Sequence, residues 1–434
     1  MTLSELKAFY LDHLFSVLLP FWTTRGIDRE HGAFFTCFNN AGDRLISGNK
    51  YIWSQGRFLW MISRFAWAFP ERLGAKGLDE IREAARRGAE FLMAHALLPN
   101  GNCAWVLDAE GRPILADRLG KTLPVKPGDR LDLGITADQF LVYGMAEYAR
   151  MADDRRAYDF AVQLFDSVQG RLARGDFHTY PHDTPAGFRS HGKPMIMVET
   201  AQELADVAVH FRDPAAFRLI ETARVSMREV LDVFLRLEHG RIFELVRADG
   251  SLAVEEMLGS FYNPGHSLED AWFLMHLARR LGDRQAVDAA AGVVRRMATD
   301  GWDAEYGGLP QYRHVTGLEP KGAVRPEHEA DHMVAELGRS WSNKLWWVHS
   351  EALYALILSY EHTKDPWFLD TYWKYHDYVF RTFPNPDRSV GEWIQIRDRK
   401  GAPEDKVVAL PVKDPYHITR AFMHLVKSLE RMGA

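Results

Sequence analysis

A short element that combines glycine with an aromatic or large apolar residue recurs six times along the chain, mostly after long stretches of helical pattern. Successive copies begin about 65 to 85 residues apart. A repeat of this kind indicates a fold made of stacked units, none of which can bury its apolar face alone. The copies lie at residues 31–35, 101–105, 175–178, 240–243, 306–309 and 391–393.

Five of the six copies lead into a tight turn, which predicts short β-hairpins. The intervals between copies carry apolar residues at three- and four-residue spacing, with room for about two helices each. About twelve helices that are apolar on more than one side pack most simply as two concentric rings of six. We therefore expect an all-α (α/α)6 barrel with short β-hairpins at one mouth; an open solenoid of helix pairs is the main alternative. The turns lie at 40–43, 108–111, 248–250, 315–317 and 399–401, and the clearest helical stretches at 78–96, 136–151, 195–211, 215–234, 267–281, 348–360 and 418–432.

Composition favours one large globular domain. The chain has 434 residues, 47% of them hydrophobic, and no linker rich in proline, glycine or serine, so we expect a single barrel domain over residues 1–434. A formal net charge of -6 argues against a nucleic-acid partner. No apolar run is long enough for a membrane span, and no signal peptide is evident. With only Cys37 and Cys103 present, a reducing, cytoplasmic location is expected.

Five segments resemble motifs of the N-acylglucosamine 2-epimerase family of sugar epimerases and isomerases, and they occur in the family's order. The resemblance implies an (α/α)6 barrel that works without a metal or other cofactor at C1 and C2 of a small reducing sugar. It also allows a homodimer, because the family often forms dimers. The segments are KYIWSQGR at 50–57, NPGHSLE at 263–269, KLWWVHSE at 344–351, GEW at 391–393 and DPYHITR at 414–420.

The chain departs from the family pattern at several points. Asp414 stands where members commonly have glycine, Thr419 stands where they commonly have proline, and the 317–340 loop is long. Cellobiose epimerases carry a histidine pair in the helix that here spans 194–199, and this pair is absent. Its absence favours the N-acylglucosamine branch. These differences bear on the identity of the sugar more than on the type of reaction.

A sugar 2-epimerase must remove the proton beside the carbonyl carbon and return it to the other face, which requires two groups that titrate near neutrality. Resemblance makes His266 and His417 this pair, and each begins a helix, whose dipole favours the neutral ring. Glu269, three residues after His266 on a helix, is expected to orient that ring. Resemblance assigns Arg57 to the enediolate oxygens; a structural salt bridge is the alternative. Either histidine could instead be structural, satisfying a helix end.

Six further residues are expected to contact the sugar. Trp346 offers a surface for stacking, and Glu351 is a candidate for assisting ring opening or binding hydroxyl groups. The alternative for Glu351 is a carboxylate that stabilises a helix start. The full set of expected substrate-binding residues is Trp53, Trp346, His349, Glu351, Glu392 and Trp393.

Residues 327–332, EHEADH, are rich in the residue types that bind metals, but they match no zinc motif. A solvated loop is the preferred interpretation, and no metal site is predicted.

Three alternatives to a 2-epimerase remain open. The same residues could carry the proton to C1, as in an aldose–ketose isomerase such as a mannose isomerase. A glycoside hydrolase would use a carboxylate pair, for which Glu351, Glu392 and Glu269 are candidates. A binding protein without activity has no need of two bases, so His266 and His417 argue against it.

Overall fold

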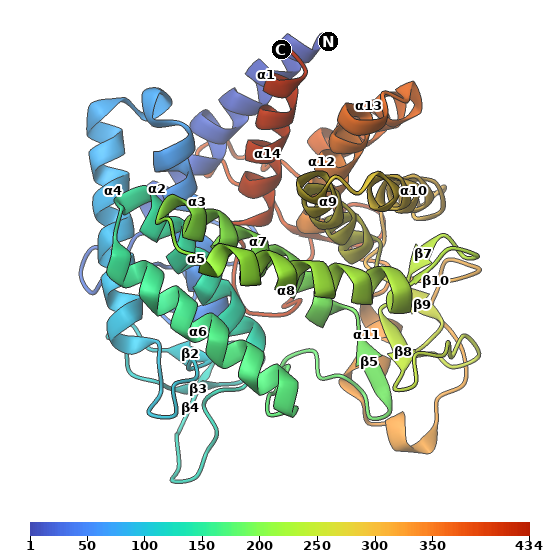
Figure 1. Cartoon of the computed structure of the whole chain (residues 1–434), viewed down its shortest axis with the longest axis horizontal. Coiled ribbons are helices and arrows are strands. Elements are labelled where there is room, and N and C mark those ends of the chain that lie inside the picture. The colour runs from blue at the N-terminus through green and yellow to red at the C-terminus, as the bar shows by residue number, and fades with distance from the viewer.

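Two concentric layers of helices form the structure, a computed structural model that describes all 434 residues. Each inner helix packs against the next inner helix, and the outer helices cover them (Figure 1). This arrangement confirms the predicted (α/α)6 barrel. The inner helices are α3 (Ile52–Ala68), α5 (Ile135–Ala152), α7 (Gly192–His210), α9 (Pro264–Leu281), α12 (Trp346–Thr363) and α14 (His417–Arg431). The outer layer consists of α1 (Leu3–Asp12) with η1 (His13–Leu18) and α2 (Leu19–Arg25), α4 (Pro70–His95), α6 (Arg155–Arg174), α8 (Ala215–Glu229) with η2 (Val230–Phe234), α10 (Arg284–Asp300) and α13 (Pro366–Thr382).

The two layers differ in how their residues are buried. In α12 every side chain from Trp346 to Ser359 is buried, as expected of a helix surrounded by protein. Outer helices such as α6 bury one face only. Glycines let α3 and α5 approach most closely: a Cβ atom at Gly56 would lie 2.1 Å from the carbonyl oxygen of Phe140, and one at Gly144 would lie 2.2 Å from that of Gly56. These two helices therefore touch backbone to backbone.

Short antiparallel strands join consecutive units of the barrel. In most cases the strand that leads into an inner helix pairs with a strand of the following unit. The expected hairpins at 40–43, 108–111 and 399–401 are real turns, but each closes on a single bridge. The strand pairs between units are β1 (Lys50–Tyr51) with β2 (Val106–Leu107), β5 (Phe188–Ser190) with β8 (Leu245–Arg247), β9 (Phe261–Tyr262) with β10 (Arg313–His314), and β11 (Lys344–Leu345) with β12 (Ile396–Arg397); the local pairs are β3 (Leu115–Ala116) with β4 (Thr122–Leu123) and β6 (Leu235–Arg236) with β7 (Arg241–Ile242).

Three buried lysines reinforce these junctions. The Nζ atom of Lys50 lies 2.8 Å from a carboxylate oxygen of Asp28 and also donates to the carbonyl of Ala109 in the next unit. Lys344 contacts Asp303 at 3.0 Å in the same way. Lys413 pairs with Glu392 at 2.8 Å and donates to the carbonyl of Asn40 at 2.7 Å.

The last unit meets the first, so the ring is closed. The backbone N–H of Lys413 donates to the carbonyl of Thr36 at 2.8 Å, and α14 packs against α1, beside which it lies in Figure 1. Trp60 of α3 packs edge to face on Tyr416, which precedes α14, with ring centroids 5.3 Å apart. The open solenoid is therefore wrong for this chain.

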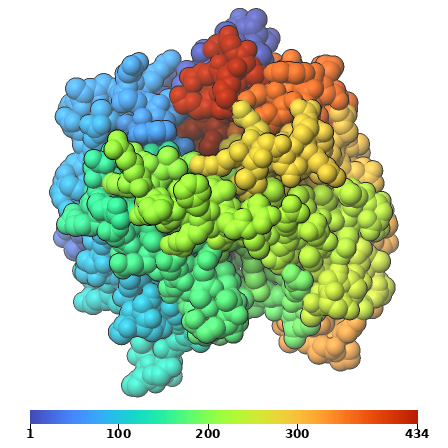
Figure 2. Space-filling model, in the orientation of Figure 1, coloured from blue at the N-terminus to red at the C-terminus, as the bar shows by residue number.

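Two long connections project from the mouth of the barrel. One contains the β3–β4 hairpin, and the other, at 317–340, contains η3 (Pro326–His328) and α11 (His332–Ser340). Figure 2 shows both projecting at the bottom of the view, in teal and orange. His328 is buried, with Nδ1 2.7 Å from Asp331, so the EHEADH segment includes folded structure and is not wholly a solvated loop. No helix of the chain has the length and apolar character needed to cross a membrane.

Candidate active site

A cavity occupies the end of the barrel at which the inner helices begin. All six inner helices contribute lining residues from their first turns or the residue just before them. The cavity encloses about 230 Å³, which is small beside the roughly 300–1,000 Å³ of typical ligand sites. Because helix N-termini carry partial positive charge, the converging helices favour an anionic ligand or intermediate in this space.

His266 lies in the first turn of α9, where the Asn263 side chain caps the helix by accepting from the N–H groups of Gly265 and His266. The Nδ1 atom of His266 lies 3.0 Å from a carboxylate oxygen of Glu244. The expectation that Glu269 orients His266 is therefore wrong: Glu269 is on the same helix, but its carboxylate is held elsewhere by Arg420. With Nδ1 engaged, Nε2 is the ring nitrogen of His266 left for the cavity.

Glu244 is itself held by a second, fully buried histidine. The Nδ1 atom of His191 lies 3.7 Å from Glu244, and its Nε2 lies 2.7 Å from Asp270. Burial opposes protonation of His191, but its hydrogen bond to Asp270 and the negative charges of Asp270 and Glu244 raise its pKa to about 9. Burial likewise opposes protonation of His266, yet the charge and hydrogen bond of Glu244 outweigh it, so the pKa of His266 lies above its ordinary value. His266 is therefore disposed to carry a proton near neutrality.

His417 has the opposite electrostatic character. It begins α14, where its N–H donates to the Asp414 side chain at 2.9 Å. Its Nδ1 lies 2.7 Å from Glu351, and because a carboxylate only accepts, Nδ1 carries the proton and Nε2 is free as a base. Burial lowers the pKa of His417 to about 3 despite the charge of nearby Glu269, so the ring is neutral at pH 7.

The two histidines flank one indole ring. The ring centroid of Trp347 lies 5.2 Å from that of His266 and 5.5 Å from that of His417. The imidazoles come from different helices, α9 and α14, and both line the cavity. A neutral ring and a ring disposed to hold a proton thus face the same small space.

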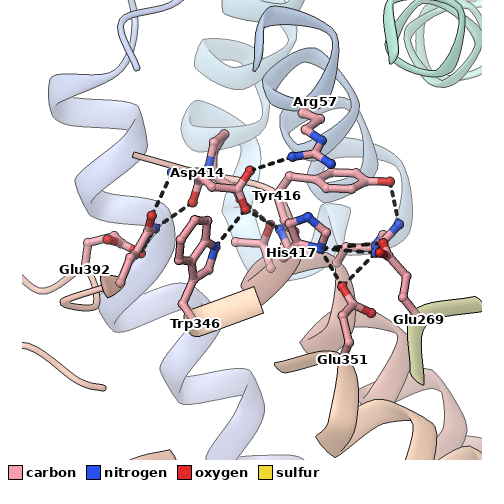
Figure 3. A network of polar contacts seen from close by, with 12 residues as sticks. Arg57, Glu269, Trp346, Glu351, Glu392, Asp414, Tyr416 and His417 are labelled. Carbon is pink, nitrogen blue, oxygen red and sulfur yellow. Dashed lines mark hydrogen bonds and ion pairs between the residues drawn. The ribbon is translucent and has the colours of Figure 1, made fainter. Parts of the chain in front are cut away.

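Arg57 lies at the start of α3 and lines the same cavity. Its guanidinium stands 4.0 Å from the ring centroid of Phe140 and 3.5 Å from a carboxylate oxygen of Asp414. Asp414 is a shared partner, because it also accepts from the indole N–H of Trp346 and the backbone of His417 (Figure 3). Asp414 stands at the position expected to be glycine from the resemblance, and it therefore links Arg57 to His417.

A compact cluster of Glu269, Glu351 and His417 has the ligand types and spacing of a metal site, with ligand atoms within 4.8 Å of one another. The guanidinium of Arg420 already supplies a cation there, since its Nη2 contacts both carboxylates. The geometry fits an internal ion-pair network that orients His417. A metal ion in this cluster would compete with Arg420 for the same oxygens.

Trp53 and Trp346 line the cavity as expected. Glu351 does not line it: its oxygens accept from His417, from Arg420 and from the indole N–H of Trp272, so it orients the base from behind.

His349, Glu392 and Trp393 are also outside the cavity lining, contrary to the expectation that they contact the sugar. Buried His349 accepts from the N–H of Leu309 and contacts the carbonyl of Leu345, so neither ring nitrogen is available. Glu392 is paired with Lys413, and the indole N–H of Trp393 donates to His13. These three side chains therefore stabilise the junctions between units of the barrel.

Sequence reasoning missed Glu244, His191 and Arg420 as parts of the site. Arg420 stood inside a motif and lies one helical turn after His417, a spacing that could have drawn attention to it. Glu244 follows the fourth glycine-aromatic element directly. Nothing in the sequence pairs it with His266, because their contact depends on how the segment before α9 folds back onto the first turn of that helix.

Comparison with known proteins identifies the family of the chain and similar folds. The family described as N-acylglucosamine 2-epimerase (GlcNAc 2-epimerase) matches residues 33–421. The N-acylglucosamine 2-epimerase of Mus musculus is 29% identical over 419 residues, covering 93% of this chain and 87% of that protein. Among solved structures, the cellobiose 2-epimerase from Bacillus thermoamylovorans B4167 has a TM-score of 0.75 at 17% identity, covering 98% of this chain and 99% of its own. A D-mannose isomerase has a TM-score of 0.72 at 17% identity, with 97% of each chain covered.

Proposed function

The chain belongs to the N-acylglucosamine 2-epimerase family, and from this premise we propose that it is a sugar 2-epimerase that interconverts N-acylglucosamine and N-acylmannosamine. The observation that carries the proposal is the pair His266 and His417. They reach one cavity from different helices, each held through Nδ1 by a different buried carboxylate. A protein that only binds sugar has no use for two oppositely tuned histidines.

The reaction uses the open-chain sugar. The free Nε2 of His417 removes the proton from C2, and the electron pair of the broken C–H bond forms a C1–C2 double bond as O1 becomes an oxyanion. His266, which holds a proton, then donates it to C2 from the other face, and the carbonyl reforms. One proton leaves the sugar and one enters, so the net change in the sugar is inversion at C2. His417 then releases its proton to water and His266 takes one up, which restores the starting form of the enzyme. The reverse reaction uses the same two groups with their roles exchanged.

Arg57 is the group we assign to the developing charge on O1. Its guanidinium lines the cavity together with His417. Asp414 contacts both residues and so links them. Fixed donors aimed at a developing oxyanion commonly contribute more than any other single effect to catalysis. The N-termini of the inner helices add positive potential in the same space.

The pKa directions support one acid and one base in the resting enzyme. Two groups whose pKa values are pushed apart by their surroundings take opposite roles in proton transfer. The pKa of His417 is lowered to about 3 by burial, whereas Glu244 raises that of His266. These shifts favour a singly protonated pair with the proton on His266, and this is the form that the reaction requires.

A glycoside hydrolase is disfavoured by the positions of the carboxylates. Retaining and inverting hydrolases need two carboxyl groups about 5 to 10 Å apart on either side of the scissile bond. Glu269 and Glu351 instead share the guanidinium of Arg420, and Glu392 is buried against Lys413. No pair among these three is free to flank a glycosidic oxygen.

We further propose one catalytic domain over residues 1–434 that acts in the cytoplasm, without a metal or other cofactor, on a small reducing sugar. One cluster of buried apolar side chains that runs from Leu6 to Leu429 supports the single domain. A homodimer remains the family-based expectation for its assembly.

Proton NMR in D2O tests the proposed function directly. The enzyme is incubated with N-acetylglucosamine, N-acetylmannosamine, glucose, mannose and cellobiose in turn. We expect deuterium at C2 of an N-acetylated sugar together with its C2 epimer. A ketose product with deuterium at C1 or C2 would identify an aldose–ketose isomerase instead, because the enediolate is common to both reactions. In a parallel incubation with a non-reducing glycoside, hydrolysis of that glycoside together with no C2 exchange in any sugar of the panel would refute both.

A further inference from the structure

A fully buried histidine lies behind the acid side of the site. His191 immediately precedes α7 and does not line the cavity. The pairing of β5 with β8 places it opposite Glu244: Ser190 pairs with Leu245, and the backbone N–H of His191 donates to the carbonyl of Glu244 at 3.0 Å. The junction between two units of the barrel therefore fixes the position of this ring.

Both ring nitrogens of His191 face a carboxylate. Nε2 lies 2.7 Å from Asp270, and Nδ1 lies 3.7 Å from Glu244. Because a carboxylate only accepts, each of the two favours a proton on the nitrogen that faces it. The ring is therefore a buried imidazolium, and its raised pKa of about 9 agrees with that charge. His191 is also the only cationic group that pairs with Asp270.

The two carboxylates connect His191 to the acid of the proposed reaction. Glu244 lies 3.0 Å from His266, and Asp270 lies one turn after His266 on α9. Two histidines and two carboxylates thus alternate in a short buried circuit. Without His191 both carboxylates would remain buried with a single cation between them, an arrangement that burial makes costly.

We propose that His191 is a positioning residue for the reaction: its positive charge holds Glu244 ionised against His266 and eases the release of the His266 proton to the sugar. The inference rests on the proposed function. Glu244 alone makes His266 hold its proton more tightly, because a carboxylate stabilises the imidazolium. The like charge of His191 lowers the pKa of His266 and so opposes this effect. An acid works best when its pKa lies near the working pH, and the two opposed charges keep His266 closer to that condition.

The other groups that face these rings do not change when His191 is replaced. Glu269, on the same helix as His266, favours the protonated ring. His182 also faces His266, but burial is the main cause that lowers the pKa of His182 to about 4, so this ring is neutral when His266 titrates. His191 itself also packs against the uncharged ring of Phe234. A change in the titration of His266 therefore reports on His191.

The first experiment is 15N NMR of the unaltered enzyme labelled at histidine, which reads the protonation of each ring nitrogen. The His191 signals are recognised by their contact with the ring of Phe234 and by their loss in His191→Asn. We expect both ring nitrogens of His191 to keep their protons through the pH range in which His266 titrates. A neutral His191 at pH 7 would overturn the proposal, whether or not the enzyme is active.

The second experiment measures kcat/KM for C2 deuterium exchange against pH in His191→Asn and His191→Gln. Both changes remove the positive charge, so the alkaline fall should move to higher pH by about one unit, the lower end of the shift that a nearby charge produces. The opposite direction is expected when Glu244 loses its charge. His210→Asn breaks an exposed histidine–aspartate pair at the end of the same helix, and as the matched control it should leave the profile unchanged.

A loss of stability with an unmoved pH profile would show that His191 is only structural and would overturn the proposal. If the enzyme exchanges no sugar, the epimerase proposal fails by itself, and the pKa of His266 is then measured from its own NMR signal. A rise of that pKa in the His191 variants supports the electrostatic role of His191, and an unchanged pKa contradicts it.

Discussion

The Nδ1 atom of His266 lies 3.0 Å from Glu244, a residue 22 positions earlier in the chain, directly before β8. The contact joins the fourth glycine-aromatic element to the first turn of α9. Its consequence is electrostatic, because a negative charge beside an imidazole favours the protonated ring. In the proposed mechanism, the pairing therefore decides which histidine starts the reaction as the acid.

The pH profile should show this pairing. We expect kcat/KM to fall as the pH rises through the raised pKa of His266, because the proton that His266 must donate is then lost. The fall should be the same in both directions, since the equilibrium between two neutral epimers does not depend on pH. Glu244→Gln removes the charge that raises this pKa, so the alkaline fall should move to lower pH. Glu238→Gln, at an exposed position, should leave the profile unchanged; an identical profile in Glu244→Gln would refute the pairing.

Replacing each histidine separately should give complementary defects. His266→Asn and His417→Asn should each reduce epimerisation by at least about 100-fold, the lower end of the contribution of a general acid or base. Each variant should still exchange the C2 proton of the one epimer whose proton faces the remaining histidine. NMR in D2O with each pure epimer measures this. Exchange of the same epimer by both variants would contradict a base on each face, and His210→Asn at the surface serves as the control.

Arg57→Lys keeps the positive charge but loses the planar fork that can contact two oxygens. We expect kcat to fall by about 100- to 1,000-fold, the cost of losing one donor to an oxyanion, with a smaller change in KM. Steady-state kinetics on the preferred monosaccharide provide the measurement. A rise in KM alone would show that Arg57 binds the ground state and does not stabilise the enediolate.

Glu392→Gln should destabilise the fold without affecting substrate binding. It leaves the ammonium group of Lys413 buried without its counter-charge, a change that typically costs about 3–5 kcal/mol. Glu430→Gln breaks an exposed pair with Lys427 and should cost less than about 1 kcal/mol. Denaturant unfolding of both variants gives the comparison. A raised KM with unchanged stability in Glu392→Gln would restore the original expectation that Glu392 binds the sugar.

The parts of the fold that the sequence predicts are those set by local periodicity. Helix spacing and the six glycine-aromatic elements predict two rings of helices, and the helical stretch expected at 267–281 lies within α9. Side-chain contacts between different units could not be predicted from local periodicity. Glu269 is correctly placed one turn from His266, but Arg420 from α14 binds its carboxylate more closely. Similarly, GEW at 391–393 resembles a site motif, yet Glu392 pairs with Lys413 and the indole N–H of Trp393 donates to His13.

Closure of the ring by Lys413 bears on how the protein unfolds. In an open array of repeats the outermost units need polar caps and fray first, so unfolding can proceed from an end. Here Lys413 of the last unit donates to the carbonyls of Thr36 and Asn40 of the first unit. No unit is therefore left with a free face. Loss of any one junction removes support from the units on both sides of it. The barrel should therefore melt in a single cooperative transition, with the reactive histidines lost only when the whole ring opens.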